Sequence, residues 1–354
     1  MKKNKILYIC FFYLLSFICT YAFFIFPFEI LSEYILNDKT SFLYSLINTI
    51  IFNALIIYYL KSHNTFKPLK IFVYEGLGIG FISFGIITLG ILLNFLTGLN
   101  DFIIGVTCLV LIILLVIYGI FKGRKIIVKN IHLFSSTITK DYNFIFISDV
   151  HLGTNDINHF LKILKKIKKI KYDFILIGGD LIDSSSFDIN QLNVLNEITQ
   201  DIYFVNGNHE YYLKDYKNKI NKIKNQNINL LKNKSIAIDE INLIGIDDFQ
   251  SEANKIKHVN TLTNKKKYNL VMSHKPDIWD NVNNNTHLML CGHTHNGQIF
   301  PFNFLVRIKF KYIYGLYKKR NNQLYVSSGA GCWGPKIRLG TSNEIIKFKL
   351  SKHN

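Results

Sequence analysis

Acidic residues are scarce in this sequence of 354 residues. Asp and Glu total 24 against 42 Lys and Arg, which gives a formal net charge of +18, and charged residues make up only 19% of the chain. An excess of basic residues is one feature of proteins that bind nucleic acid. Here the Lys residues are spread along the whole chain together with Asn and Ile. We therefore interpret the charge as a compositional bias and expect no nucleic-acid partner.

Cysteine is also sparse, and its pattern does not suggest disulfide bonds. The five cysteines are an odd number and include no Cys-x-x-Cys pair. Cys10, Cys19 and Cys108 lie in long apolar runs, where a free cysteine behaves as a small hydrophobe. This argues against a disulfide framework and against a structural zinc site built on thiolates. The apolar content of 49% likewise argues against a disordered or fibrous chain.

Four apolar stretches fill the first third of the chain. Each is close to or above the roughly 20 residues that cross a bilayer as a helix. They cover 6–26, 42–60, 71–93 and 102–121. We predict a four-helix transmembrane region, 1–123, followed by a domain at 124–354. Glycines of the third stretch favour close helix packing, and Glu75 is the only acid inside a stretch, near its end, which favours packing over a transport path.

The loops indicate the orientation of these helices. Basic residues fall on alternate loops, before the first stretch, after the second and after the fourth, as the positive-inside rule requires. We therefore expect a multi-pass protein of the cell membrane with both termini and the second domain in the cytoplasm. The first stretch could instead be a cleaved signal peptide ending at Ala22, but its apolar run is long and continues past that residue.

The rest of the chain alternates short apolar runs with amphipathic ones. We predict strands at 144–147, 174–177 and 202–205, separated by helices at 157–171 and 190–199. Five more strands, at 242–246, 270–272, 287–290, 323–326 and 345–350, have shorter connections. This order predicts an α/β sandwich of two mixed sheets.

Polar side chains follow five of these strands. The segments are Asp149-Val150-His151, Gly178 to Asp183, Asn206 to Glu210, the single His274, and Gly292 to His295. Strand ends at one edge of an α/β sheet converge, so these side chains can meet in one pocket. Mixed carboxylate and imidazole ligands suit two ions of Mn, Fe or Zn, and such a pair neutralises a phosphoryl group and makes a nucleophilic hydroxide near neutral pH.

These five motifs, in this order, resemble those of the calcineurin-like metallophosphoesterase family. The resemblance covers about 142–350, and Asn296-Gly297-Gln298 together with 325–340 resembles a bacterial membrane-linked subgroup. It implies a first metal on Asp149, His151 and His295, and a second on Asn208, His274 and His293, with Asp180 bridging both. It also implies that His209 protonates the leaving oxygen and that Asp183 orients His209.

Alternatives remain for several residues. Asp183 could cap a helix that starts at Ser184, and Glu210 is better explained as a helix-start residue than as a catalytic one. Ser184 stands where phosphoprotein phosphatases of the family have an Arg, which argues against a phosphoprotein substrate. The aromatic and basic stretch 298–317 fits either a membrane interface or a hairpin packed on the core. Helix 160–171 is expected to face the core with a solvated Lys side.

The sequence therefore predicts a membrane-anchored, dinuclear-metal-dependent phosphoesterase. We expect it to hydrolyse a phosphate ester or pyrophosphate that is lipid-linked, because four helices are an excessive anchor for an enzyme acting on a soluble compound. Two alternatives stay open: a phosphodiesterase for a soluble nucleotide, and a membrane sensor or transporter with a non-catalytic phosphoesterase-like domain.

Overall fold

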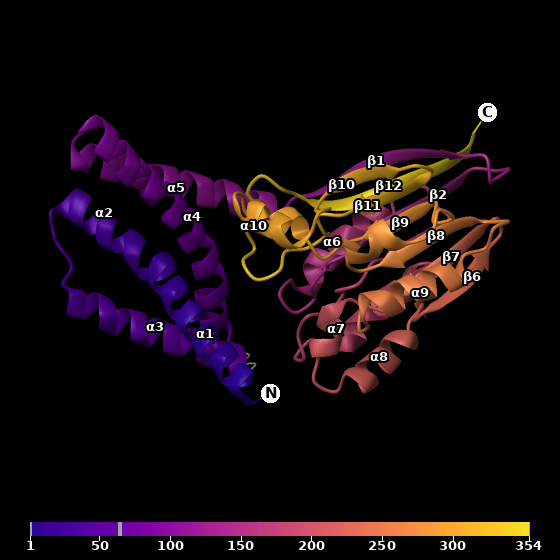
Figure 1. The fold of residues 1–354 in the computed structure, drawn as a ribbon, viewed down its shortest axis with the longest axis horizontal. Coiled ribbons are helices and arrows are strands. Elements are labelled where there is room, and N and C mark those ends of the chain that lie inside the picture. Colours follow the sequence, from indigo (N-terminus) through magenta and orange to yellow (C-terminus); the bar gives the residue numbers. More distant parts are fainter. Residues whose placement is uncertain (1, 63–65, 354) are drawn as a thin grey trace. The chain divides into compact units, whose positions relative to one another are not determined.

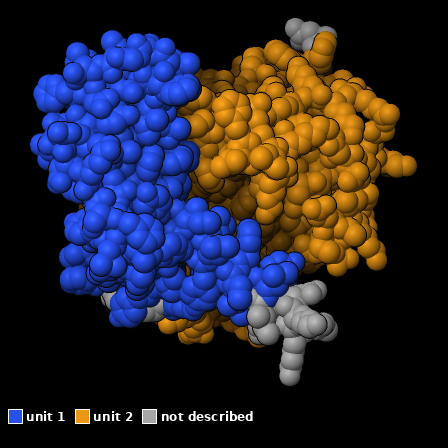
Figure 2. All heavy atoms as spheres, turned by 60° about the vertical axis from the view of Figure 1, so that its left-hand side comes forward, with its two compact units in different colours: residues 1–121, 334–337 blue, residues 122–333, 338–354 orange. Residues whose placement is uncertain are grey.

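The computed structural model describes residues 2–62 and 66–353 (Figure 1). Contacts divide the chain into two compact units, which Figure 2 colours separately. Unit 1 contains Met1–Phe121 and the short segment Gly334–Ile337, and unit 2 contains Lys122–Trp333 and Arg338–Asn354.

Unit 1 is built from helices. Four helical runs are long and apolar enough to cross a membrane: Leu7–Leu36, Phe42–Lys61, Lys67–Thr97 and Asp101–Arg124. The elements are α1 (Lys2–Thr20), the π-helix η1 (Tyr21–Ile25), α2 (Phe26–Leu36), α3 (Phe42–Ser62), α4 (Lys67–Thr97) and α5 (Asp101–Arg124). The first run is longer than the apolar stretch 6–26, because Pro27 stands in the first turn of α2, where its missing N–H costs no helical hydrogen bond. Glu29 and Glu33 consequently lie in a helix and not in a loop.

Polar side chains join the helices of unit 1. Asn53 of α3 donates hydrogen bonds to the hydroxyls of Ser16 (2.7 Å) and Thr20 (3.0 Å) on α1. Such bonds between membrane helices contribute about 0.6 kcal/mol each on average. The glycines of α4 allow close approach, since a Cβ at Gly80 would lie 2.1 Å from the carbonyl oxygen of Phe23.

Unit 2 contains two six-stranded mixed sheets, which confirms the predicted fold class. The first has the order β1-β12-β2-β3-β4-β5, in which β2 to β5 are parallel and β12 is antiparallel to β2. The second has the order β10-β11-β9-β8-β7-β6, with parallel inner strands and an antiparallel strand at each edge. In chain order the strands are β1 (Ile126–Ser135), β2 (Tyr142–Ile147), β3 (Phe174–Ile177), β4 (Ile202–Phe204), β5 (Asn229–Leu230), β6 (Lys234–Ile238), β7 (Ile241–Ile246), β8 (Tyr268–Ser273), β9 (Leu288–Cys291), β10 (Gly315–Lys319), β11 (Asn322–Val326) and β12 (Asn343–Lys352).

Three hydrophobic layers hold unit 2 together. One fills the space between the sheets, with Phe144, Leu270 and Phe348 fully buried in it. The outer layers lie under helices: α6 (Ile157–Ile167), η2 (Ile189–Glu197) and α8 (Tyr216–Lys224) cover the first sheet, and α9 (Glu252–Leu262) and η3 (Pro276–Asn281) cover the second. The inner strands are apolar on both sides because both of their faces are covered. As expected, α6 turns its apolar side to the core.

The sequence allowed either a membrane interface or a packed hairpin for the stretch 298–317, and the structure places a helix within it. Helix α10 (Phe302–Lys309) buries none of its residues, and a hairpin follows only at β10 and β11. Its exposed apolar side chains are Phe302, Phe304, Leu305 and Ile308. The packed hairpin is therefore wrong for 302–309, because apolar residues spaced three and four apart lie along a helix and not on one face of a strand.

Candidate metal centre

The predicted ligands converge from both sheets of unit 2. Asp149, Asp180 and Asn208 follow β2, β3 and β4 of the first sheet, where α7 (Asn208–Tyr212) begins. His274 and the pair His293 and His295 follow β8 and β9 of the second sheet, where η4 (His295–Gly297) begins. Since these strands end at neighbouring edges, residues far apart in the sequence come together.

A first group consists of Asp149, His151 and His295. The Nε2 atoms of the two imidazoles lie 3.1 Å apart, and they lie 3.9 Å (His151) and 3.7 Å (His295) from Oδ1 of Asp149. All three side chains are almost fully buried. One ligand atom from each residue lies within 4.8 Å of the others, as a metal site requires.

A second group consists of Asp180, His274 and His293. Nε2 of His274 lies 3.1 Å from Oδ2 of Asp180 and 3.2 Å from Nδ1 of His293. The other nitrogen of His274, Nδ1, donates to the carbonyl of Gly178 (2.9 Å), which leaves Nε2 to face the carboxylate. Oδ1 of Asn208 is buried without a hydrogen-bond partner.

Asp180 lies between the two groups. Its Oδ2 atom is 3.1 Å from His274 and 3.8 Å from Nε2 of His151, which belongs to the first group. Its Oδ1 atom accepts a hydrogen bond from the backbone N–H of His209 (2.9 Å). Its position is that of a carboxylate able to reach cations on both sides.

The backbone at the site is strained. Asp149, His151, Asp180, His293 and His295 have φ between 48° and 71°, a left-handed conformation that L-residues adopt uncommonly. Such conformations cost roughly 1–3 kcal/mol each and persist where the surrounding structure enforces them, mostly at functional sites. Five of the seven predicted ligands are therefore held in conformations that packing alone does not favour.

Asp183 lies against His151. Its Oδ2 atom is 3.3 Å from Nδ1 of that ring and accepts a hydrogen bond from the hydroxyl of Thr154 (2.5 Å), while its Oδ1 atom accepts one from the backbone N–H of Thr154 (2.8 Å). No helix starts at Ser184, so Asp183 is not a helix cap. One ligand atom from each of Asp183, His151 and His209 lies within 4.8 Å of the others. Among the described residues no ion pair links Asp183 to His209, and Oδ2 of Asp180 lies 3.9 Å from Nε2 of His209. That Asp183 orients His209 stays a prediction.

Two buried charged residues support the site. Glu210 begins α7, as expected, and its carboxylate also accepts from the backbone N–H groups of Asp180 (3.0 Å), Ile182 (3.1 Å) and Gly207 (2.7 Å). Arg338 donates to the carbonyls of Ser328 (2.6 Å) and Gly331 (2.8 Å) and lies 3.4 Å from Nδ1 of His295. Full burial of a Glu or Arg is rare in globular proteins. The sequence placed Glu210 in a motif and Arg338 in the segment 325–340, but it gave no hydrogen-bond partner for either side chain.

The protonation of the imidazoles follows from burial and from their neighbours. Burial lowers the pKa of His293 to about 2 and that of His209 to about 4, so both rings are neutral at pH 7. Burial acts in the same direction on His274, but Asp180 and Asp149 outweigh it and raise the pKa to about 10. A cation that binds Nε2 of His274 must displace that proton, so metal binding here releases protons and weakens at low pH.

This donor set fits divalent cations. Two groups of carboxylate and imidazole atoms surround a shared carboxylate, and the unpartnered amide oxygen of Asn208 supplies one more neutral donor. Carboxylates and imidazoles together suit transition metals, whereas Ca and Mg prefer oxygen alone. The clusters are typical of a dinuclear metal site.

A recess of about 360 Å³ adjoins the second group. Asn208 lines it together with Tyr211, Tyr212, Asp248, Phe249, Gln250 and Lys275. The side chain of Lys275 is 23% exposed, and its ammonium lies 2.5 Å from Oδ2 of Asp248. Phe249 and Tyr212 are 73% and 66% exposed, so aromatic surface stands at the rim. A cation and aromatic rings therefore flank the predicted ligand Asn208.

Comparison with known proteins points to the same chemistry. Residues 142–297 match the family model for calcineurin-like phosphoesterases. The chain is 33% identical over 244 residues to an uncharacterized metallophosphoesterase of Campylobacter jejuni, covering 63% of each chain. It is 32% identical over 239 residues to one of Helicobacter pylori (64% of each) and 29% identical over 233 residues to a bovine transmembrane protein with a metallophosphoesterase domain (58% of this chain, 52% of that one). The chain thus spans less than two thirds of the length of these relatives.

Proposed function

We propose that this chain, whose residues 142–297 match the calcineurin-like phosphoesterases, is a membrane-anchored hydrolase of phosphate esters or pyrophosphates that uses two divalent metal ions. Asp149, His151 and His295 would hold the first ion, Asn208, His274 and His293 the second, and Asp180 both. The ions would be Mn, Fe or Zn. The observation that carries this proposal is the convergence of two His and Asp groups around the shared carboxylate of Asp180.

In the proposed hydrolysis, the metal ions and the side chains of the protein have different roles. When bound, two divalent cations neutralise phosphoryl charge and acidify water. His209 stands beside the groups with its ring 17% exposed, and in this proposal it delivers the proton to the leaving oxygen. Its pKa of about 4 is low for an acid at pH 7, but a phosphate anion beside the ring would raise that pKa. Asp183, fixed by Thr154, holds the ring of His151 in place.

Helix α10 supports a lipid-linked substrate. Its exposed apolar side chains alternate with Arg307 and Lys309, a pattern that suits an anionic membrane interface. The helix leads directly to Phe310, whose ring centroid lies 5.2 Å from that of His293. A substrate anchored by an acyl chain along α10 could therefore place its phosphate at the site.

The recess beside Asn208 favours a second candidate, a phosphodiesterase for a soluble nucleotide. A base could stack on Phe249 or Tyr212, since base–aromatic stacking contributes about 1–3 kcal/mol. Lys275 could pair with a phosphate. A sensor or transporter with a non-catalytic domain is disfavoured, because the six Asp and His residues among the seven predicted ligands lie in the two groups described above.

Loop charge places the termini and unit 2 in the cytoplasm in this proposal. The loop 37–41 would then be external, and the connection between α3 and α4, with Lys61, Lys67 and Lys70 around it, would be internal.

Hydrolysis of bis-p-nitrophenyl phosphate by the full chain in detergent tests the proposal. We expect a chelator to abolish hydrolysis, and Mn to restore it better than Ca. Full activity in excess chelator would refute the two-metal mechanism. A panel of lipid phosphates and nucleotides, assayed with Mn, then separates the two substrate classes.

A further inference from the structure

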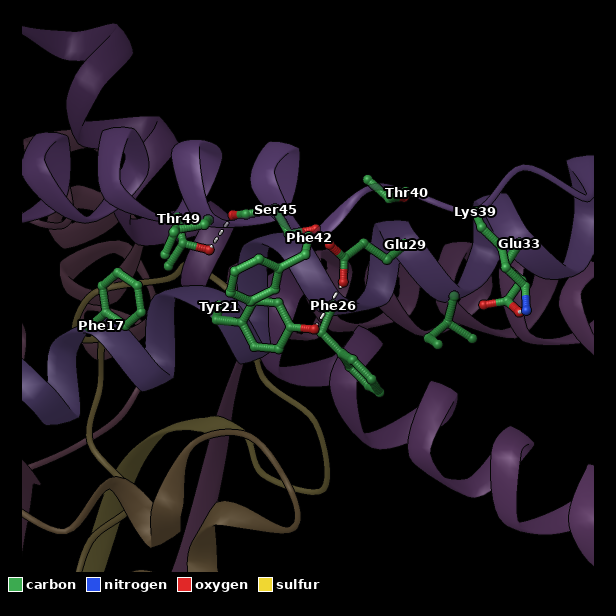
Figure 3. Close-up of a pocket in the computed structure, with 12 residues that line it drawn as sticks. Phe17, Tyr21, Phe26, Glu29, Glu33, Lys39, Thr40, Phe42, Ser45 and Thr49 are labelled. Atoms are coloured by element: carbon green, nitrogen blue, oxygen red, sulfur yellow. Dashed lines mark hydrogen bonds and ion pairs between the residues drawn. The ribbon is translucent and has the colours of Figure 1, made fainter.

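Unit 1 contains a cavity of about 490 Å³ that the proposed hydrolysis does not use. It opens between η1 and α2 on one side and the start of α3 on the other (Figure 3). Most of its wall is apolar. Seven of its twelve lining residues nevertheless carry polar groups: Tyr21, Glu29, Glu33, Lys39, Thr40, Ser45 and Thr49. A cavity in a membrane unit that combines an apolar wall with an ionisable residue calls for a functional explanation.

Glu29 is the centre of this cavity. Its carboxylate accepts hydrogen bonds from the hydroxyls of Tyr21 (2.9 Å) and Ser45, which Figure 3 shows directed at it. These two donors are neutral, so they stabilise the negative charge without cancelling it. Among the residues that the structure describes, no Lys or Arg forms an ion pair with Glu29, since Lys39 pairs with Glu33 (3.1 Å). The site therefore lacks one positive charge.

Aromatic rings line the cavity that contains this carboxylate. Phe17, Tyr21, Phe26 and Phe42 line the cavity, and the rings of Tyr21 and Phe26 have centroids 6.2 Å apart. The face of an aromatic ring attracts ammonium cations, and cages of such rings are used to bind quaternary ammonium groups. Tyr21 also begins the π-helical turn η1, and single π-turns inside α-helices are frequent at functional sites. The carboxylate and the rings thus both favour a ligand with a positively charged ammonium group.

We propose that this cavity, which we call the Glu29 cavity, binds the headgroup of an aminophospholipid, with its ammonium on Glu29. The apolar wall formed by Ile30 and Leu46 would contact the start of the acyl chains, and the exposed Lys39 lies at the same cavity for the phosphate. This inference stands on unit 1 alone and does not depend on the hydrolytic activity.

Native mass spectrometry of the full chain in detergent tests the proposal with phosphatidylethanolamine and phosphatidylglycerol at matched concentrations. We expect phosphatidylethanolamine to be retained at a roughly tenfold lower concentration, and dodecylamine to displace it. Glu29→Gln keeps the size of the side chain but removes its charge, and should abolish this preference. Asp38→Asn, an equal loss of charge on the exposed loop after α2, should preserve it.

Equal retention of the two lipids by the unaltered chain would overturn the proposal. So would a preference that survives Glu29→Gln, one that Asp38→Asn also removes, or a failure of dodecylamine to compete. If Glu29→Gln does not fold, Phe42→Leu replaces it as the test, because Phe42 is 81% exposed and its ring contributes little to the core. That variant should weaken retention of phosphatidylethanolamine and leave that of phosphatidylglycerol unchanged.

Discussion

At the scale of single residues, Asp180 and His209 lie side by side but should behave differently on substitution. Asp180→Asn removes the carboxylate between the two groups, so we expect both ions to bind poorly and activity to fall with metal content. His209→Ala should leave metal content intact and lower the rate by about 10²–10⁴-fold on an alkyl ester. The rate of this variant on an aryl ester should fall less, because an aryl leaving group needs little protonation. Elemental analysis beside rates on both esters gives the measurement.

The two outcomes separate a ligand from an acid. If His209→Ala loses metal, or loses equal activity on both esters, then His209 is a ligand or a structural residue. If Asp180→Asn retains both metals and its activity, the bridging role is wrong.

Gly207 offers a test that substitutes none of the predicted ligands. A Cβ at this position would lie 2.1 Å from Oδ1 of Asp180, so Gly207→Ala should push that carboxylate aside. We expect metal affinity to fall by roughly 10–100-fold, as it does when the groups that orient a ligand are lost. Gly85→Ala is the control, because no atom lies within 4 Å of its Cβ position. Titration of the metal-free protein with Mn measures the effect, and equal affinity in both variants would contradict it.

A residue's role could be predicted from the sequence only where the residues around it in the chain, and not distant contacts in the folded protein, indicate that role. The sequence indicated which polar residues could meet, because each proposed ligand stands in a short motif at the end of an apolar strand; their roles as ligands come from the family resemblance and stay a prediction. The contacts of Asp183 with His151 and Thr154 could not be read from the sequence, since they depend on which way the ring of His151 turns and on Thr154, outside any motif. Glu210 and Arg338 bind backbone groups that only the folded loops bring to them.

At the scale of elements, α10 is the segment whose environment matters most for the substrate. Ile308 is 82% exposed, and we expect it to contact lipid. An environment-sensitive dye attached at Ile308→Cys in nanodiscs should emit at a shorter wavelength than the same dye at Lys266→Cys, an exposed loop position. Both variants carry Cys10→Ser and Cys19→Ser, since the other cysteines are buried. Equal, water-like emission at both sites would rule out membrane contact by α10.

Strands and helices with a clear apolar pattern were predicted at nearly the observed residues, whereas exposed or very short elements were not. Strands β2 and β3 and helix α6 lie where the apolar pattern placed them. The predicted helix 190–199 is a 3-10 helix, η2, at Ile189–Glu197. All four edge strands, β1, β5, β6 and β10, were missed. β5 has only two residues, and β6 and β10 are largely exposed.

At the scale of the whole molecule, the orientation in the membrane decides where the metal centre works. A reporter fused after the last residue should behave as cytoplasmic, and one inserted at Asp38, in the loop between α2 and α3, as external. Paired enzymatic reporters that are active on opposite sides of the membrane make the measurement. The reverse pattern would overturn the loop-charge argument and would place the Glu29 cavity at the cytoplasmic face.

The origin of the proposed ligands in two different sheets has a mechanical consequence. The first sheet supplies Asp149, Asp180 and Asn208, and the second supplies His274 and His293. A bound pair of ions would therefore link the two sheets of the sandwich. A ligand that binds only the folded chain adds about 2.7 kcal/mol of stability at 100 times its Kd. Opening of the sandwich would then respond to the concentration of free metal around it, and the resistance of this domain to proteolysis would report how well the cell supplies that metal.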